Sequence, residues 1–152
     1  MKKLLIISLC LVFAAIAING AYAQFAKPEY AIKYRKAVMF LIAQHFGRMG
    51  AMVKEKVPYN QEVFAKNAML VQTLSRLPWE AAMVPGTDSG DTTLNSEVFM
   101  KPAEFKEISQ DFETQTAKLV SLAQSGDFTA TKSQFGEVGK SCKACHTQFR
   151  TK

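Results

Sequence analysis

Cysteine is scarce in this sequence, and strand-like patterns and low-complexity tracts are missing. Only three cysteines occur among the 152 residues, and two of them, Cys142 and Cys145, lie three residues apart. A disulfide that closes so short a loop stabilises a fold less than one that closes a long loop. No stretch sustains the alternation of apolar and polar residues that is typical of a half-buried strand. The sequence therefore predicts helices, and the paired cysteines indicate chemistry rather than a structural crosslink.

Concentrated positive charge is missing too. The formal net charge is +6, and it falls to +4 if Lys2 and Lys3 are removed. These cations do not gather into a basic run, which argues against nucleic-acid binding. The sequence also lacks the combination of nucleophile and general base expected of an ordinary enzyme. We expect a binding or redox protein.

The first 23 residues read as a secretory signal peptide. Met1-Lys2-Lys3 is a short basic region, residues 4–18 are almost wholly apolar, and Ala21-Tyr22-Ala23 is a cleavage signature. The apolar run is shorter than the roughly 20 residues that span a bilayer. Cys10 follows Leu9 rather than a small residue, which disfavours a lipoprotein. We expect cleavage before Gln24, an exported chain without membrane insertion, and one mature domain over residues 24–152.

Four segments carry apolar residues at steps of three and four, the spacing of one helical face. Proline suits the start of a helix and glycine its end. The predicted helices run from about Pro28 to Val53, from Asn60 to about Leu77, from Pro102 to Gly126, and from Asp127 or Thr129 through the paired cysteines. Leu41 is expected on the inward face of the first.

Residues 78–101 break this pattern. The stretch from Pro85 to Asp91 is rich in turn-forming residues, and we expect Trp79 and Phe99 to hold the ends of a surface loop against the core. Short connections join the first helix to the second and the third to the fourth, which favours antiparallel neighbours. The predicted fold class is all-α, an antiparallel up-down-up-down four-helix bundle.

Cys142-Lys143-Ala144-Cys145-His146 is the feature that carries chemistry. Residues i, i+3 and i+4 share one helical face, with Cβ atoms about 5–6 Å apart. Two thiols so placed can add to the two vinyl groups along one edge of a protoporphyrin, and the imidazole then projects toward the iron. This spacing is the pattern of c-type haem attachment. It fits export, because such attachment takes place outside the cytoplasm.

Two other readings of these residues are less favoured. A thioredoxin-like redox pair requires a strand–helix setting, and no strand is predicted. A zinc site could combine Cys142, Cys145 and His146 with His45. The adjacent Cys145 and His146 point awkwardly for a tetrahedron, and the spacing fits no common zinc pattern.

With the motif near the end of the fourth helix, the chain resembles the proteobacterial cytochromes c′, a family of class II c-type cytochromes. The resemblance covers essentially the whole mature chain. It rests on Lys33-Tyr34-Arg35, His45-Phe46-Gly47-Arg48-Met49, Leu77-Pro78-Trp79 and Ser141-Cys142 through His146 with Arg150. It implies a periplasmic protein with one covalently bound haem c per chain, attached through Cys142 and Cys145, with His146 as an axial ligand of the iron.

The resemblance also implies roles for other residues. Met39 matches the position on the distal face, which most family members leave uncoordinated. Arg35 resembles a residue that contacts a propionate, with Lys36 as a possible helper. Arg150 matches a basic residue beside the proximal pocket, and Trp79 and Phe149 are expected to touch the porphyrin. His45 lies about 9 Å further along the helix than Met39, too far to reach the same iron.

Function turns on the sixth coordination position. With Met39 uncoordinated, the resemblance implies a five-coordinate haem that binds nitric oxide and carbon monoxide, a role in binding or detoxifying nitric oxide, and release of the proximal histidine when nitric oxide binds. The alternative is a six-coordinate, low-spin electron carrier with Met39 as ligand. An apolar distal side disfavours dioxygen storage, and thioether links disfavour haem delivery. The family further implies an unidentified redox partner and a homodimer through the first two helices.

Overall fold

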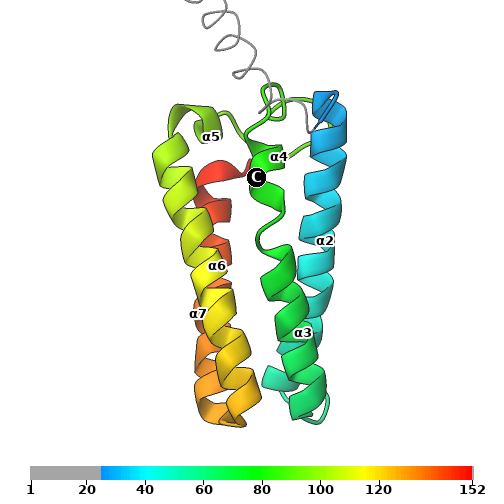
Figure 1. Ribbon diagram of the computed structural model, residues 1–152, viewed down its shortest axis with the longest axis vertical. Helices are drawn as coiled ribbons and strands as arrows, with labels where there is room; N and C mark the ends of the chain where they lie inside the picture. The colour runs from blue at the N-terminus through cyan, green and yellow to red at the C-terminus, as the bar shows by residue number, and fades with distance from the viewer. Residues whose placement is uncertain (1–24, 152) are drawn as a thin grey trace, which may run out of the picture.

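The computed structural model describes residues 25–151, which form four long helices and two short ones (Figure 1). The signal peptide predicted for residues 1–23 lies outside the described residues. The long helices are α2 (Pro28–Val53), α3 (Gln61–Leu74), α6 (Pro102–Ser125) and α7 (Phe128–Phe149). They alternate in direction along the bundle, so the predicted all-α, up-down-up-down four-helix fold is confirmed.

Residues close in sequence set most of the helix ends. Pro28 and Pro102 begin α2 and α6, where a missing N–H removes no intrahelical bond. Asn60 and Asp127 cap α3 and α7, because their side chains accept hydrogen bonds from the N–H groups of Val63 and Ala130, both at 2.9 Å. Gly126 ends α6 at φ 85°, in the left-handed region that suits glycine.

The segment between α3 and α6 is more ordered than predicted. Helix α3 ends at Leu74, three residues before the predicted end at about Leu77, and Leu77 is exposed. The chain then forms α4 (Pro78–Ala82) and α5 (Glu97–Met100) inside the expected loop. Pro78 begins α4, where its missing N–H removes no intrahelical bond. Leu41 also lies outward, contrary to the expectation.

The core divides into two clusters. The larger lies between the long helices and contains Val38, Met49, Phe64, Val71, Leu119 and Val138 among others. The smaller, at the end of the bundle that carries α4 and α5, contains Ala82, Val98, Phe105 and Phe149. Trp79 packs against both clusters. Within residues 25–151, no helix is long and apolar enough to cross a membrane.

Candidate functional site

The last three turns of α7 carry the predicted attachment motif. Cys142 packs against the larger core cluster and Cys145 against the smaller one, and both thiols are free and partly buried. Burial raises the pKa of each thiol to about 11, so both are protonated at neutral pH. His146 is more exposed, as the next position around the helix requires. Partial burial of its ring and the charge of Arg150 lower the pKa of His146, which favours the neutral, metal-binding imidazole.

Helices α2 and α7 are the most widely separated of the four neighbouring pairs. Their backbones approach each other less closely than those of α2 and α3, α3 and α6, or α6 and α7. At one level, Phe46 of α2 fills the space by stacking on Phe135 of α7, with ring centroids 4.1 Å apart. Nearer the motif, Met39 of α2 and Cys142 of α7 both pack against the larger cluster, and Met39 is half-buried. We call this space between α2 and α7 the seam. Met39 lies on one of its two helices and the motif on the other.

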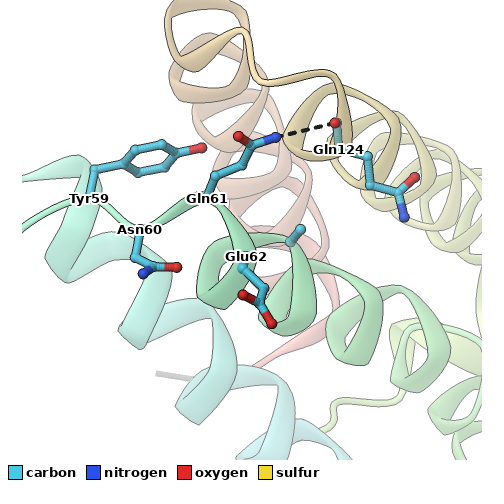
Figure 2. Close-up of a pocket in the computed structure, with 6 residues that line it drawn as sticks. Tyr59, Asn60, Gln61, Glu62 and Gln124 are labelled. Atoms are coloured by element: carbon cyan, nitrogen blue, oxygen red, sulfur yellow. Dashed lines mark hydrogen bonds between the residues drawn. The ribbon is translucent and has the colours of Figure 1, made fainter.

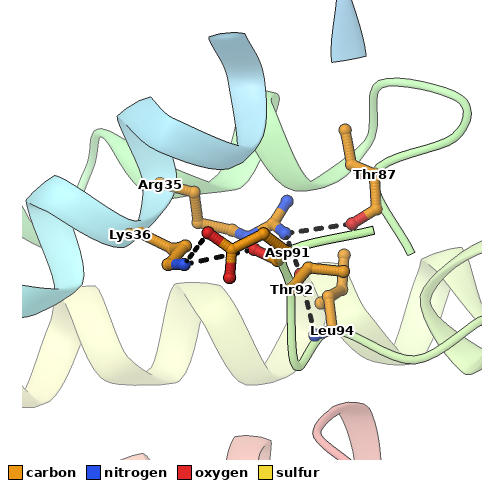
Figure 3. Close-up of polar contacts among 6 residues, drawn as sticks. All are labelled: Arg35, Lys36, Thr87, Asp91, Thr92 and Leu94. Atoms are coloured by element: carbon orange, nitrogen blue, oxygen red, sulfur yellow. Dashed lines mark hydrogen bonds and ion pairs between the residues drawn. The ribbon is translucent and has the colours of Figure 1, made fainter. Parts of the chain in front are cut away.

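Arg35 is a buried cation whose partners are all neutral. It is 7% exposed, and its guanidinium donates to the carbonyls of Ala81 and Thr87 and to Thr92 Oγ1, at 3.2, 3.0 and 2.7 Å. Figure 3 shows it reaching from α2 into the loop after α4. Burial lowers its pKa, yet none of the ion pairs among the described residues includes it. Three donated bonds leave two of the five guanidinium N–H groups for an anion.

Lys36, the next residue, holds the same loop from the surface. Its ammonium lies 2.6 Å from a carboxylate oxygen of Asp91 and 3.2 Å from the Asp91 carbonyl (Figure 3). The hydrogen bond and charge of Lys36 lower the pKa of Asp91. Both side chains are well exposed, so the pair contributes little to stability.

The loop continues to the end of α7. The Asn95 N–H donates to the Phe149 carbonyl at 3.1 Å, and the Thr151 N–H donates to the Thr93 carbonyl at 2.8 Å. These two bonds flank an isolated antiparallel bridge between Leu94 and Arg150. Nothing in the local sequence around residue 95 predicts this pairing.

Trp79 and Phe149 lie beside the motif. Phe149 is 1% exposed and packs edge-on against Phe105, with ring centroids 5.1 Å apart. Trp79 packs edge-on against Phe105 and Phe112. Its buried indole N–H finds no acceptor among the described residues, although buried donors are rarely left unpaired. The unpaired Trp79 N–H and the free N–H groups of Arg35 are donors that a carboxylate at this end of the bundle can satisfy.

His45 is remote from this arrangement. Its Nδ1 lies 2.9 Å from Oδ1 of Asn67 on α3, a contact that joins the two helices. Among residues 25–151, no three His, Cys, Asp or Glu side chains gather as a metal-binding group. An open cleft of about 610 Å³ lies at the opposite end of the bundle from the motif (Figure 2), lined by Tyr59, Asn60, Gln61, Glu62, Ala65 and Gln124.

Comparison with known proteins agrees with this geometry. The sequence profile of the Cytochrome C′ family matches residues 30–150. The chain belongs to the cytochrome c′ family. It is 45% identical over 129 residues to cytochrome c′ of Alcaligenes xylosoxydans xylosoxydans, a match that covers 85% of this chain and 99% of that protein. The cytochrome c prime structure from Shewanella frigidimarina superposes with a TM-score of 0.82 at 38% identity, covering 85% and 100% of the two chains. A nitric oxide complex of a cytochrome c prime variant from Alcaligenes xylosoxidans gives 0.78 at 43% identity, covering 85% and 99%.

As a cytochrome c′, the chain carries one covalently bound haem c. The residues present suit this cofactor. Two thiols spaced for thioether formation face the core, and beside them the backbones of α2 and α7 lie further apart than those of the other neighbouring helices. Arg35 and the Trp79 indole supply N–H donors that can satisfy carboxylates. The sequence motif predicted the cofactor, whereas the orphaned Trp79 donor and the neutral partners of Arg35 appear only in the structure.

Proposed function

We propose that this chain is a periplasmic mono-haem cytochrome c′ that binds nitric oxide and carbon monoxide at a five-coordinate haem and takes part in binding or detoxifying nitric oxide. Cys142 and Cys145 form the thioether links, and His146 is the axial ligand. The observation that carries the proposal is the space between α2 and α7, with the motif on α7 and the apolar side chain of Met39 on α2. When bound, haem c supplies an iron that coordinates a diatomic gas.

The chain's own residues would hold the cofactor from several sides. Arg35 has its Nε–H and one Nη1–H left, and each can donate a single charge-assisted hydrogen bond to a propionate. The Trp79 N–H offers a further donor. Phe149 follows the motif at the end of α7, and because its ring is fully buried it excludes water from that side. Lys36 is engaged with Asp91, so we assign it to holding the loop near the cofactor rather than to a direct contact.

Met39 decides between gas binding and electron transfer. A thioether sulfur that packs in the seam without coordinating leaves the sixth position free for a small ligand. It also offers no hydrogen-bond donor, which disfavours stable binding of dioxygen relative to nitric oxide and carbon monoxide. A coordinating sulfur would instead give a six-coordinate electron carrier. Met39 is half-buried against the same core cluster as Cys142, and its coordination to the iron is the property that the test measures.

Absorption spectra of the reduced holoprotein, recorded with and without carbon monoxide, provide this test. We expect a broad, high-spin Soret band that shifts when carbon monoxide is added. The variant Met39→Ala should retain this spectrum and bind carbon monoxide faster, because a side chain that blocks the distal side becomes smaller. Sharp low-spin bands that ignore carbon monoxide, and that become high-spin only in Met39→Ala, would show that Met39 is a ligand. Mass spectrometry of the purified protein should find both sulfurs as thioethers.

Two further features belong to this proposal. Large apolar side chains are exposed on the outer faces of α2 and α3, namely Phe40, Leu41, Val63, Met69 and Leu70. Such a surface supports a homodimer through these two helices, which sedimentation equilibrium would detect. Export to the periplasm, with removal of residues 1–23, predicts a mature chain that begins at Gln24, as the intact mass would report. An acceptor or donor of electrons would be a separate redox protein.

A further inference from the structure

Within the described residues, the end of α7 has no cap of its own. The last four carbonyls of any helix lack intrahelical partners, and glycine often ends the helix so that following residues can satisfy them. Here the residue after α7 is Arg150, which is extended, with φ −124° and ψ 134°. The chain therefore leaves the helix without turning back, and its final carbonyls require partners from elsewhere.

Asn95 provides two of these partners. Its backbone N–H donates to the carbonyl of Phe149 at 3.1 Å, and its side-chain amide donates to the carbonyl of Gln148 at 2.9 Å. The amide oxygen of the same side chain accepts from the N–H of Glu97 at 3.1 Å, at the start of α5. One residue thus caps a helix whose end lies more than fifty positions further along the chain.

Residues 92–95, which we call the strap, connect this cap to α2. Thr92 Oγ1 accepts from Arg35 at 2.7 Å and from the N–H of Leu94 at 3.1 Å (Figure 3). Leu94 then pairs with Arg150. The strap therefore joins the buried guanidinium of Arg35 to the final turn of α7 through consecutive hydrogen bonds, and this turn begins with His146.

We propose that Asn95 is a positioning residue that fixes the last turn of α7, and with it the approach of His146 to the haem iron and the place of Arg150 beside it. This inference rests on the proposed function, because it takes His146 as the axial ligand. A helix end with unsatisfied carbonyls frays. The strap prevents fraying where the ligand-bearing residues lie.

The test is the substitution Asn95→Asp in the holoprotein. Aspartate keeps an oxygen for the Glu97 N–H but cannot donate to the Gln148 carbonyl, and its charge is unfavourable at a helix C-terminus. The matched control is Asn60→Asp at the other end of the bundle. The Asn60 side chain only accepts, from the Val63 N–H, so aspartate preserves its cap.

Two measurements follow. The Thr151 amide donates to Thr93 in the strap. Its hydrogen exchange should accelerate about tenfold in Asn95→Asp, because the strap opens more often once the bond from Asn95 to the Gln148 carbonyl is lost. The iron–histidine stretching band of the reduced protein, measured by resonance Raman spectroscopy, should shift or broaden. Neither quantity should change in Asn60→Asp. An accelerated exchange with an unchanged band would show that the strap only closes the fold, and unchanged exchange would show that Asn95 does not hold the helix end; either result overturns the proposal.

A second variant covers the case in which Asn95→Asp fails to fold. Thr151→Pro removes the N–H that donates to Thr93, and the extended Arg150 already has the conformation that a following proline favours. A shifted band in Thr151→Pro supports positioning by the strap, and an unchanged band overturns it. If the wild-type protein shows no iron–histidine band, or binds no nitric oxide, the proposed function fails. An unchanged band in the variants overturns this inference alone.

Discussion

The two ends of the bundle close in different ways. At the end that carries the α2–α3 and α6–α7 turns, Asn60 and Asp127 cap helix N-termini within three residues of themselves, and Gly126 ends α6 in a left-handed conformation. A long-range contact also joins this end, because the Gln61 side chain donates to the carbonyls of Ala123 and Gln124 (Figure 2). At the other end, the side chains of Arg35 and Asn95 donate to carbonyls that lie 46–53 residues away. At the first end local sequence caps the helix starts, whereas at the second the contacts of Arg35 and Asn95 form only after distant segments meet. The cofactor motif lies at the second end, so order around it depends on the whole fold.

The largest effect on stability should come from truncating one buried phenylalanine in each core cluster. The variants are Phe149→Ala at the motif end and Phe64→Ala near the turn end. Both rings are essentially buried, and each deletion should reduce the free energy of unfolding by about 3–5 kcal/mol. Only Phe149→Ala should also change the visible haem spectrum, because residue 149 lies one turn beyond His146. Urea unfolding and absorption spectra measure the two effects. Equal spectral changes in both variants would contradict the distinction between the ends.

Removing the local caps should have a moderate effect that stays local. Asn60→Ala and Asp127→Ala each delete the acceptor for a helix N-terminal N–H, which costs about 1 kcal/mol. We expect lower urea midpoints with unchanged slopes, and a haem spectrum identical to that of the wild type. A cap variant that altered carbon monoxide binding would show that the turn end communicates with the cofactor.

The smallest effect concerns the surface pair of Lys36 and Asp91. The pKa of the Asp91 carboxyl is lowered in the folded protein by the hydrogen bond and charge of Lys36. The pair therefore contributes above the unfolded carboxyl pKa of about 4 and is lost as pH falls through the lower folded value. Asp91→Asn should be slightly less stable at neutral pH and equal to the wild type in acid. Thermal unfolding at neutral and acid pH measures the difference in stability between Asp91→Asn and the wild type. Added salt should reduce this difference, because salt screens the exposed pair.

The sequence predicted the parts of this structure that local chemistry controls. Pro28, Pro102, Gly126 and Asp127 set helix boundaries, and the predicted boundaries agree with the observed ones. Periodicity alone was misleading for Leu77, because Ser75 and Pro78 end α3 earlier than the apolar spacing suggested.

The motif end could not be predicted in the same way. Asn95 has the same side chain as Asn60, yet nothing in its neighbours indicates a bond to Gln148. Arg35 could be assigned to a propionate only through family resemblance, and its bonds to Ala81, Thr87 and Thr92 came from the structure. Contacts between distant segments follow from how helices pack, which single-sequence patterns do not encode.

The strap's partners lie far from it along the chain, and this separation affects the order in which the protein folds. Bringing residues more than fifty positions apart into register requires a larger loss of chain entropy than closing a short turn. The two helical hairpins can thus form early, while the strap engages late. Until it does, the terminal turn of α7, which directly follows Cys145, stays loose, and in this state an attachment enzyme can reach the motif most readily.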